Sequence, residues 1–345
     1  MKNYEQKFLL RNKLPSVSVV IATYNSSDSI MECLESVFSQ DYPKERLEVI
    51  IVDGGSLDNT LDILRRFKVK LYKVPPEKQE AEYNKGTGAS HAKNELVLFI
   101  DADNVLPHKM WLRKMVKPMV EDESIIGSET LRFHYDKRDL ILDRYFALLG
   151  GVDPVPYYLG KNSKLSWAFE KYNLLGESKD MEEYFRVKLS GKRIPVIGAN
   201  GFILRRKLLK YIKPGPENFF HTDINYDLIQ KGFNIYAFVK DSIIHLKRTK
   251  VLNFINFLIR RKYIMETQYF ERMKNRRHAV FVPETDIIYL IKYIIYALTF
   301  VKPTYDAIRG YTKIKDIAWF LHPLICFSYL IVYSWVVVSR VMKKL

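Results

Sequence analysis

Residues 96–103 read LVLFIDAD, an apolar run that ends in two carboxylates one residue apart. Five consecutive apolar residues predict a strand that is buried on both faces, as strands of parallel sheets usually are. Asp101 and Asp103 follow at the carboxyl end of this strand, the edge where open α/β sheets bind their ligands. Carboxylates at that edge suit Mg²⁺ or Mn²⁺, which share their remaining positions with substrate phosphates. The alternative interpretation is a solvated acidic turn.

Strands and helices alternate along the rest of the first hundred residues. Further apolar strands are predicted over residues 17–22, 47–52 and 69–74, with helices over 29–40, 58–67 and 86–93. This alternation predicts an α/β fold with a mainly parallel sheet flanked by helices. The chain has no Walker-type phosphate loop, and residues 86–91 lack the third glycine of the dinucleotide fingerprint. Neither P-loop NTPases nor Rossmann dehydrogenases are therefore supported.

The alternation stops at residues 127–197, which are rich in aromatic residues and Gly/Pro turns. We interpret this stretch as an insertion that shapes an acceptor pocket, and the alternative is a structural excursion without substrate contact. Regular patterning returns over 198–206 and 221–245. We therefore expect one main domain over residues 1–250.

The last third of the chain is basic. Residues 242–345 hold 18 Lys/Arg against 6 Asp/Glu, within a formal net charge of +16 for the whole chain. We expect a basic amphipathic linker over 251–284 at an anionic membrane surface, followed by membrane-associated helices over 285–345. Zinc-finger spacing and RNA-binding signatures are both missing from the sequence, so nucleic acid is not an expected partner.

Two apolar stretches lie in this C-terminal region. Residues 287–301 are interrupted by Lys292, whereas residues 317–338 are 22 residues without a charge. A bilayer needs about 20 apolar residues in a helix, so the two stretches form either a transmembrane hairpin or one span and one interfacial helix. A buried helix of a soluble domain is the alternative for the second stretch, because Pro323 would interrupt a span.

Cysteine usage and the first residues of the chain bear on its location. Cys33 and Cys326 lie far apart and imply neither a disulfide framework nor a metal cluster, so a reducing compartment is expected. Residues 1–14 are charged and lack a long apolar core, so no cleaved signal peptide is expected. With basic flanks on the apolar helices, this predicts a main domain on the cytoplasmic side of the cell membrane.

Three motifs, in this order and spacing, resemble glycosyltransferase family 2, whose members have the GT-A fold. They are VVIATYN at 19–25, VDGGSLDNT at 52–60 and FIDAD at 99–103. Residues 198–206 and 221–232 resemble later elements of the family less specifically. Residues 127–197 and the C-terminal quarter match no general family pattern. The resemblance implies a hexosyltransferase that uses a nucleotide sugar and inverts the anomeric configuration.

The chain departs from the family pattern at three places. Gly54 stands where a second Asp is frequent, so one nucleotide contact of the family is not expected here. Lys85 occupies a position where Arg is usual, which keeps the charge but loses the bidentate fork. His221, Thr222 and Asp223 replace a common Glu-Asp pair, so Asp223 is the only carboxylate at that position.

The resemblance implies roles in donor binding for five residues. Asp103 is expected to ligate Mg²⁺ or Mn²⁺ directly, and Asp101 to reach the metal through water or to contact the ribose. Thr23 and Asn25, which end the first strand, are expected to hold the base. Asp53 is expected to accept a hydrogen bond from the base or the ribose, and the alternative is that it caps the turn before residue 58.

Three further residues are candidates for the chemistry. Lys85 meets a phosphate or is a solvated lysine. Asp223 is the candidate base that accepts the proton of an acceptor hydroxyl, and its alternative role is a helix N-cap. If the acceptor is a lipid phosphate, no base is needed. His245, which ends a strand that returns towards the site, is a candidate third metal or diphosphate ligand, with a structural histidine as the alternative.

We therefore expect a membrane-bound, metal-dependent transferase that moves a sugar from a nucleotide donor to a lipid-linked acceptor or a growing glycan. Two other classes remain open. A catalytically inactive GT-A binding module at the membrane is disfavoured by the carboxylates Asp101, Asp103 and Asp223. A nucleotidyltransferase is disfavoured because no Gly-rich phosphate loop follows the first strand. Processive polysaccharide synthases are disfavoured because the QxxRW signature is missing from the sequence.

Overall fold

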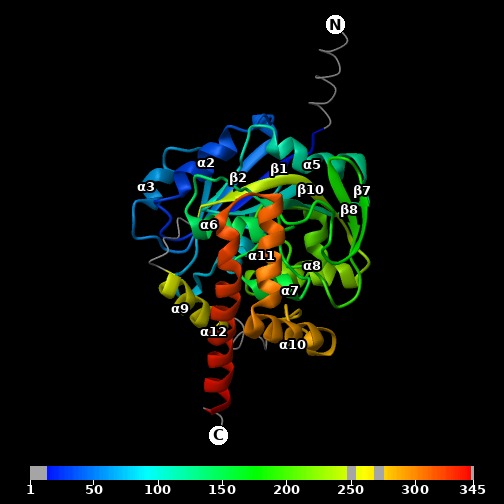
Figure 1. Ribbon diagram of the computed structural model, residues 1–345. Helices are drawn as coiled ribbons and strands as arrows, with labels where there is room; N and C mark the ends of the chain where they lie inside the picture. The colour runs from blue at the N-terminus through cyan, green and yellow to red at the C-terminus, as the bar shows by residue number, and fades with distance from the viewer. Residues whose placement is uncertain (1–13, 247–253, 268–275, 343–345) are drawn as a thin grey trace. The chain divides into compact units, whose positions relative to one another are not determined.

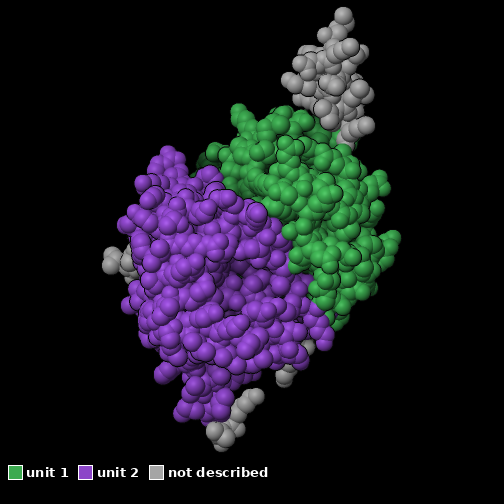
Figure 2. Space-filling view, turned by 45° about the vertical axis from the view of Figure 1, so that its right-hand side comes forward, with its two compact units in different colours: residues 1–131, 176–191, 197–246 green, residues 132–175, 192–196, 247–345 purple. Residues whose placement is uncertain are grey.

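The structure, a computed structural model, describes residues 14–246, 254–267 and 276–342, and the chain divides into two compact units (Figure 2). Unit 1 comprises residues 1–131, 176–191 and 197–246, and unit 2 comprises residues 132–175, 192–196 and 247–345. The predicted insertion at 127–197 is therefore divided between the units, and its role at the acceptor stays a prediction. Residues 251–253, 268–275 and 343–345 of the predicted linker and C-terminal flank lie outside the described residues.

A ten-stranded sheet forms the centre of unit 1 (Figure 1). Its strand order is β3-β2-β1-β4-β9-β6-β10-β8-β7, and β5 pairs with β10 beside this path. β1 pairs in parallel with β2 and β4, and β2 with β3, whereas β9 pairs antiparallel with β4 and β6. The α/β class expected from the sequence is confirmed. The strands are β1 (Val17–Thr23), β2 (Leu47–Asp53), β3 (Lys70–Lys73), β4 (Leu96–Asp101), β5 (Asn104–Val105), β6 (Gly127–Phe133), β7 (Glu177–Asp180), β8 (Tyr184–Lys188), β9 (Phe202–Arg205) and β10 (Ile235–His245).

Helices belong to both units (Figure 1). Those of unit 1 are α2 (Ile30–Phe38), α3 (Thr60–Leu64), α4 (Ala81–His91), α5 (Trp111–Glu121) and α8 (His221–Gln230). Those of unit 2 are α6 (Ile141–Leu149), α7 (Pro154–Tyr158), α9 (Phe254–Ile264), α10 (Pro283–Thr299), α11 (Val301–Lys313) and α12 (His322–Met342).

The parallel strands bring three predicted site residues to one edge of the sheet. All seven residues of β1 are buried, as are the last five of β2 and the first five of β4, because these strands form the apolar core. Parallel strands end at the same edge. The register places Thr23 opposite Asp53 and Ala22 opposite Asp101.

Helix α4 is longer than the sequence predicted. It begins at Ala81 instead of Gly86, so Lys85 lies inside the helix and not in the loop before it. The helix packs closely on the sheet, because a Cβ added to Gly88 would lie only 2.4 Å from Val20 Cγ1 of β1. This close approach carries the first turns of α4 to the carboxyl ends of the parallel strands.

Unit 2 is helical and has an aromatic core. Its main buried cluster includes Tyr145 of α6, Trp319 of a short 3₁₀ turn and Tyr329 of α12. A Cβ added to Gly310 of α11 would lie 2.4 Å from the Trp319 ring. Glycine at this position therefore allows α11 to approach the 3₁₀ turn closely.

The predicted apolar helix over residues 287–301 is found as α10, which ends two residues earlier, and a second helix that the sequence analysis did not predict follows it. α10 ends at Thr299 and α11 begins at Val301, and the two are bent by 83°. Phe300 between them has a φ of 60°, the left-handed conformation that ends many helices. Pro303 lies in the first turn of α11, where its missing N–H costs nothing, whereas in a continuous helix it would remove a hydrogen bond.

One helical segment among the described residues, Ile317–Met342, is long and apolar enough to cross a bilayer, and 28% of its most apolar stretch is buried within the protein. The bent pair of α10 and α11 would supply a second candidate if both helices counted as one span. The segment starts as a 3₁₀ turn (Ile317–Leu321) and continues as α12. Pro323 therefore lies where the helix changes type and does not end it.

Candidate functional site

Lys85 is buried at the carboxyl edge of the sheet, with 2% of its side chain exposed. Its Nζ lies 2.8 Å from Asp101 Oδ1 at the end of β4 and 3.7 Å from Glu82 Oε1 on the same helix. Glu82 in turn accepts a hydrogen bond of 2.8 Å from the backbone N–H of His221, and its Oε1 lies 3.0 Å from His221 Nδ1. These charges connect the end of β4 with the start of α8.

The pKa values in this group follow from burial and charge together. Burial alone would raise the pKa of Glu82, but the charges of His221 and Lys85 and the hydrogen bonds from His221 outweigh it and lower the pKa to about 2. Burial alone would lower the pKa of Lys85, but Asp101 and Glu82 outweigh it and raise the pKa above its ordinary value. Glu82 and Lys85 are therefore both held in their charged forms.

Asp103 lies beside His245 because of the sheet register. β5 pairs antiparallel with β10 so that His245 is opposite Asn104, and Asp103 Oδ2 lies 3.1 Å from His245 Nε2. Asn104 is completely buried and links the backbone at Asp101 to the Asp103 carboxylate. Its Oδ1 accepts from the backbone N–H of Asp101 at 3.0 Å, and its Nδ2 donates to Asp103 Oδ1 at 3.2 Å. The Asp103 carboxylate is thus tied to the end of β4 by a third side chain.

The donor atoms at this edge fit an open divalent-metal site. Among the described residues no three His, Cys, Asp or Glu side chains converge as they do in a closed metal site. Mg²⁺ and Mn²⁺ need only one or two carboxylates when substrate phosphates supply other ligands. Asp103 and His245 offer an oxygen and a nitrogen side by side, and both side chains remain partly exposed. The chemistry of this pair suits such a metal bridging to a diphosphate.

Asp53 and Asn25 organise two adjoining loops. Asp53 is fully buried, and its Oδ2 accepts from the backbone N–H groups of Gly55 and Ser56 at 2.9 and 3.0 Å. Ser56 Oγ donates to Asp53 Oδ1 and accepts from the Asn25 N–H at 2.8 Å. Asn25 Oδ1 accepts from the Leu57 N–H at 2.8 Å. These contacts fit the turn-capping alternative for Asp53, and its contact with a nucleotide stays a prediction.

Two buried polar atoms at this edge have no hydrogen-bond partner among the described residues. They are Thr23 Oγ1 at the end of β1 and Asn84 Oδ1 on α4. Thr23 is 3% exposed and Asn84 is 1% exposed. Because buried polar groups are nearly always hydrogen-bonded, such atoms need a partner that the described part of the chain does not supply. A bound ligand with donor groups, such as a nucleotide base, meets that need.

Asp223 is buried, with 1% exposed, in the first turn of α8. The residue at the N-cap position is Phe220, so the N-cap alternative for Asp223 is wrong. A carboxylate in the first helical turn is favoured by the helix dipole. Asp223 is two residues from His221, which contacts Glu82. If Asp223 acts as the base, the first turn of α8 would have to open so that this buried carboxylate could reach the acceptor.

The structure brings Lys85 to Asp101, although the sequence analysis gave these two residues separate roles. It also places His245 beside Asp103, and the sequence analysis named both as candidate ligands of one metal. Sequence reasoning missed Glu82, Asn84 and Asn104. A signal existed for Glu82, because it lies three residues before Lys85 on one helix face. Asn104 directly follows the acidic pair. Asn84 carries no signal of its own, since its importance depends on the burial of α4 against the sheet.

Comparison with known proteins agrees with this geometry. The sequence profile described as "Glycosyl transferase family 2" matches residues 18–210. Glycosyltransferase AglE of Haloferax volcanii is 32% identical over 140 residues, which cover 39% of this chain and 46% of that protein. A dolichyl N-acetyl-α-D-glucosaminyl phosphate 3-β-D-2,3-diacetamido-2,3-dideoxy-β-D-glucuronosyltransferase of Methanococcus voltae is 39% identical over 77 residues, 20% of this chain and 24% of that protein. The chain thus spans less than half the length of these relatives.

Among solved structures, the mannosyltransferase PcManGT from Pyrobaculum calidifontis, in complex with GDP-Man and Mn²⁺, has a TM-score of 0.52. Its sequence identity is 16%, and the match covers 99% of this chain and 94% of that one. At this identity the similarity concerns the fold alone. It confirms the GT-A fold expected from the sequence.

The low pKa of Glu82 predicts a specific pH dependence of stability. A carboxylate whose pKa is lower in the folded state than in the unfolded state stabilises the protein at pH values above its ordinary pKa of 4.5. This stabilisation is lost as the pH falls towards 2. Wild-type protein should lose up to about 3 kcal/mol from this source between pH 6 and pH 2. Glu82→Gln should be less stable than wild type at pH 6 and should show a smaller fall in Tm on acidification.

The exposed Glu77 on the preceding segment provides the control, because Glu77→Gln removes a carboxylate without touching the buried group. Its Tm should follow the wild-type pH profile. If Glu82→Gln and wild type lost the same Tm between pH 6 and pH 3, the charged state assigned to Glu82 would be wrong.

Proposed function

Because this chain belongs to glycosyl transferase family 2, we propose that it transfers a sugar from a nucleotide-sugar donor to a glycan or lipid-linked acceptor. The observation that carries the proposal is the pairing at the carboxyl end of β4, where Lys85 holds Asp101 and His245 lies beside Asp103. This edge of the sheet holds both carboxylates and a lysine, and such a combination suits a diphosphate bound together with a divalent metal. The unpartnered Thr23 Oγ1 at the same edge supports a base-binding role there.

The donor side of the reaction needs charge stabilisation of a leaving diphosphate. Asp103 and His245 would hold Mg²⁺ or Mn²⁺, and Asp101 would reach it through water or contact the ribose. The metal would act there as a Lewis acid on the diphosphate. Lys85 keeps its charge and fixes Asp101 by the 2.8 Å contact, so its role is to position that carboxylate. Asn104 holds the Asp103 carboxylate against the end of β4.

The acceptor step forms one bond and breaks one. An acceptor oxygen attacks the anomeric carbon as the bond to the diphosphate oxygen breaks, and the diphosphate leaves with the bonding electron pair. Direct displacement inverts the anomeric configuration. With a hydroxyl acceptor the proton passes to Asp223, whose helix turn must open since the side chain is buried. With a phosphate acceptor, which is already ionised, Asp223 only positions the acceptor.

The surface of unit 2 supports association with a membrane. Large apolar side chains are exposed on α10 and α12, among them Ile291 (45% exposed), Ile295 (51%) and Trp335 (63%). The basic residues Arg260 and Arg261 lie on α9. Apolar helices beside basic residues favour an anionic cytoplasmic leaflet. We infer that α12 anchors the chain and that unit 1 lies on the cytoplasmic side.

Replacing the metal-ligating carboxylate should abolish turnover. Detergent-purified protein with Mn²⁺ should release a nucleoside diphosphate from one member of a panel of sugar nucleotides when native membrane lipids or glycan are present. Asp103→Ala should lower this rate at least about a hundredfold, because charge stabilisation of the leaving group is lost. EDTA should have the same effect on the wild type.

The exposed Asp62 on α3 supplies the control, since Asp62→Ala removes a carboxylate far along the chain from β4. Its rate should equal that of wild type. Donor binding without turnover, with every donor and acceptor tried, would instead favour the inactive binding module. Turnover that Asp103→Ala leaves unchanged would remove the carboxylate pair from the mechanism.

The proposed orientation can be measured by cysteine labelling. Both native cysteines, Cys33 and Cys326, are free and buried, so a membrane-impermeant maleimide should not label the folded wild type. Asp62→Cys creates an exposed thiol on unit 1. In intact cells this thiol should stay unlabelled, and permeabilisation should allow labelling. Labelling of intact cells would place unit 1 on the outer side and contradict the proposed location.

A further inference from the structure

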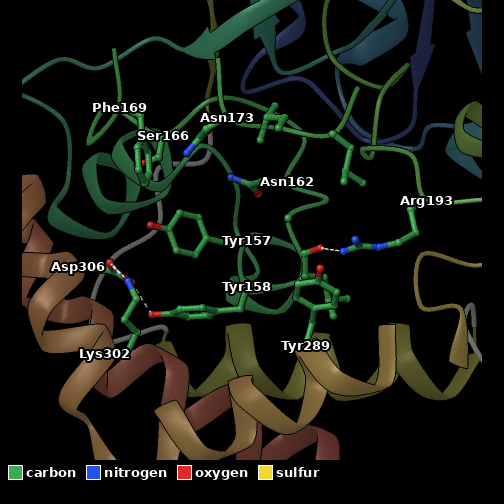
Figure 3. A pocket seen from close by; sticks show the side chains of 14 residues that line it. Tyr157, Tyr158, Asn162, Ser166, Phe169, Asn173, Arg193, Tyr289, Lys302 and Asp306 are labelled. Atoms are coloured by element: carbon green, nitrogen blue, oxygen red, sulfur yellow. Dashed lines mark hydrogen bonds and ion pairs between the residues drawn. The ribbon is translucent and has the colours of Figure 1, made fainter. Parts of the chain in front are cut away.

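Unit 2 contains a pocket of about 310 Å³ that none of the predicted site residues lines (Figure 3). Its lining comes from α7, the loop after it, Arg193, and the two bent helices α10 and α11. All of these segments belong to unit 2, so the pocket is described by that unit alone. Its volume is at the lower end of the about 300–1,000 Å³ that small-molecule pockets occupy.

The lining combines aromatic rings with side-chain amides. Tyr157, Tyr158 and Tyr289 present their rings to the pocket, and Asn173 lies across from them (Figure 3). Asn162 also lines the pocket, but it is buried and its Nδ2 donates to two backbone carbonyls. An aromatic ring covers an apolar surface, and an amide both donates and accepts hydrogen bonds. A sugar ring needs both kinds of contact, because it has apolar C–H faces and a rim of hydroxyl groups.

Both cations of the lining are already paired with carboxylates, although Asp286 is shared between Arg193 and Lys161. Arg193 Nε lies 2.9 Å from Asp286 Oδ1, and Lys302 forms an ion pair with Asp306. A phosphate group is bound by cations that are available for charge-assisted hydrogen bonds. Here each cation already faces a carboxylate. The pocket therefore favours a neutral, hydroxyl-rich ligand over a phosphate.

A chain of hydrogen bonds holds one wall of the pocket in place. Tyr145 Oη lies 2.7 Å from His322 Nδ1, and His322 Nε2 lies 3.0 Å from Tyr158 Oη. Tyr158 Oη in turn donates to Asp306 Oδ2 at 3.1 Å. One proton assignment satisfies the whole chain: Tyr145 donates to Nδ1, and the Nε2–H of a neutral His322 donates to Tyr158. The wall is thus preorganised before any ligand arrives.

The opposite wall is fixed by buried charges. Lys161 and Asp286 are both completely buried, and Lys161 Nζ lies 2.5 Å from Asp286 Oδ2. Asp286 also binds Arg193, whose Nη2 donates to the Leu159 carbonyl at 2.7 Å and whose guanidinium lies 4.2 Å from the Tyr289 ring centroid. Removing one member of such a buried pair is costly. α10 and the loop after α7 are therefore held together at the pocket.

We propose that this pocket binds a neutral saccharide unit, and, resting on the proposed function, that the unit belongs to the acceptor. Its aromatic rings cover the faces of the sugar, and Asn173 and Asp306 pair with the hydroxyl groups. The acceptor class is then a glycan or a lipid-linked saccharide. A lipid monophosphate without a sugar does not fit this pocket.

Filling the pocket tests the inference. Asn173 is exposed at the pocket rim, so Asn173→Trp adds bulk into the opening without disturbing the core. Binding of a panel of neutral mono-, di- and trisaccharides to the detergent-purified protein would be measured by saturation-transfer NMR and titration calorimetry. Wild type should bind at least one member, and Asn173→Trp should weaken that binding roughly tenfold or more. Asn173→Ala, which only removes the amide, should weaken it less.

Lys171 provides a matched control, because it is exposed on the same segment and does not line the pocket. Lys171→Trp should bind the saccharide as wild type does. Binding of Mn²⁺ together with a nucleoside diphosphate, which needs no acceptor, should be equal in all variants. Its loss in every variant and in wild type would contradict the proposed function and not this inference. The inference is overturned if the wild type binds no saccharide of the panel, or if Asn173→Trp binds the saccharide as tightly as the wild type does. It is also overturned if the wild type binds inorganic phosphate and Asn173→Trp does not, because the pocket would then be a phosphate site.

Discussion

The candidate site depends on a buried ammonium group. Lys85 lies between Asp101 and Glu82 with almost no exposure to water. A buried charge is costly unless it is paired, and removing one partner leaves the other uncompensated. The pairing therefore forces α4, the end of β4 and the start of α8 to stay together, because Glu82 also binds His221. The Asp101 carboxylate is held in place by this constraint before any donor binds.

A glycine makes this arrangement possible. Gly88 lies almost one turn after Lys85, and any side chain there would collide with Val20 of β1. The helix can therefore lie close enough to the sheet for its lysine to reach the strand ends. Fold and site are connected at this point, since the same apolar strands that form the core also deliver their carboxyl ends to one edge.

Sequence reasoning recovers what periodicity and strand ends encode. The apolar run before Asp101 predicts β4, and strand alternation predicts that Thr23, Asp53 and Asp101 share an edge. The spacing of Glu82 and Lys85 on one helix face is visible in the sequence, but the contact of Lys85 with Asp101 was not predictable, because it depends on how deeply α4 is buried. The break at Phe300 was missed for a related reason: apolar patterning continues across it, and only the backbone conformation and Pro303 divide the helix.

The most direct test of the account is Mn²⁺ binding, followed by electron paramagnetic resonance, with and without nucleoside diphosphates. Asp103 and His245 supply too few ligands to hold the ion tightly alone, whereas a diphosphate would complete the coordination. The account predicts weak Mn²⁺ binding by itself and clearly tighter binding, at one ion per chain, when one nucleoside diphosphate is added. The account would be contradicted if none of the nucleoside diphosphates changed the affinity of the protein for Mn²⁺.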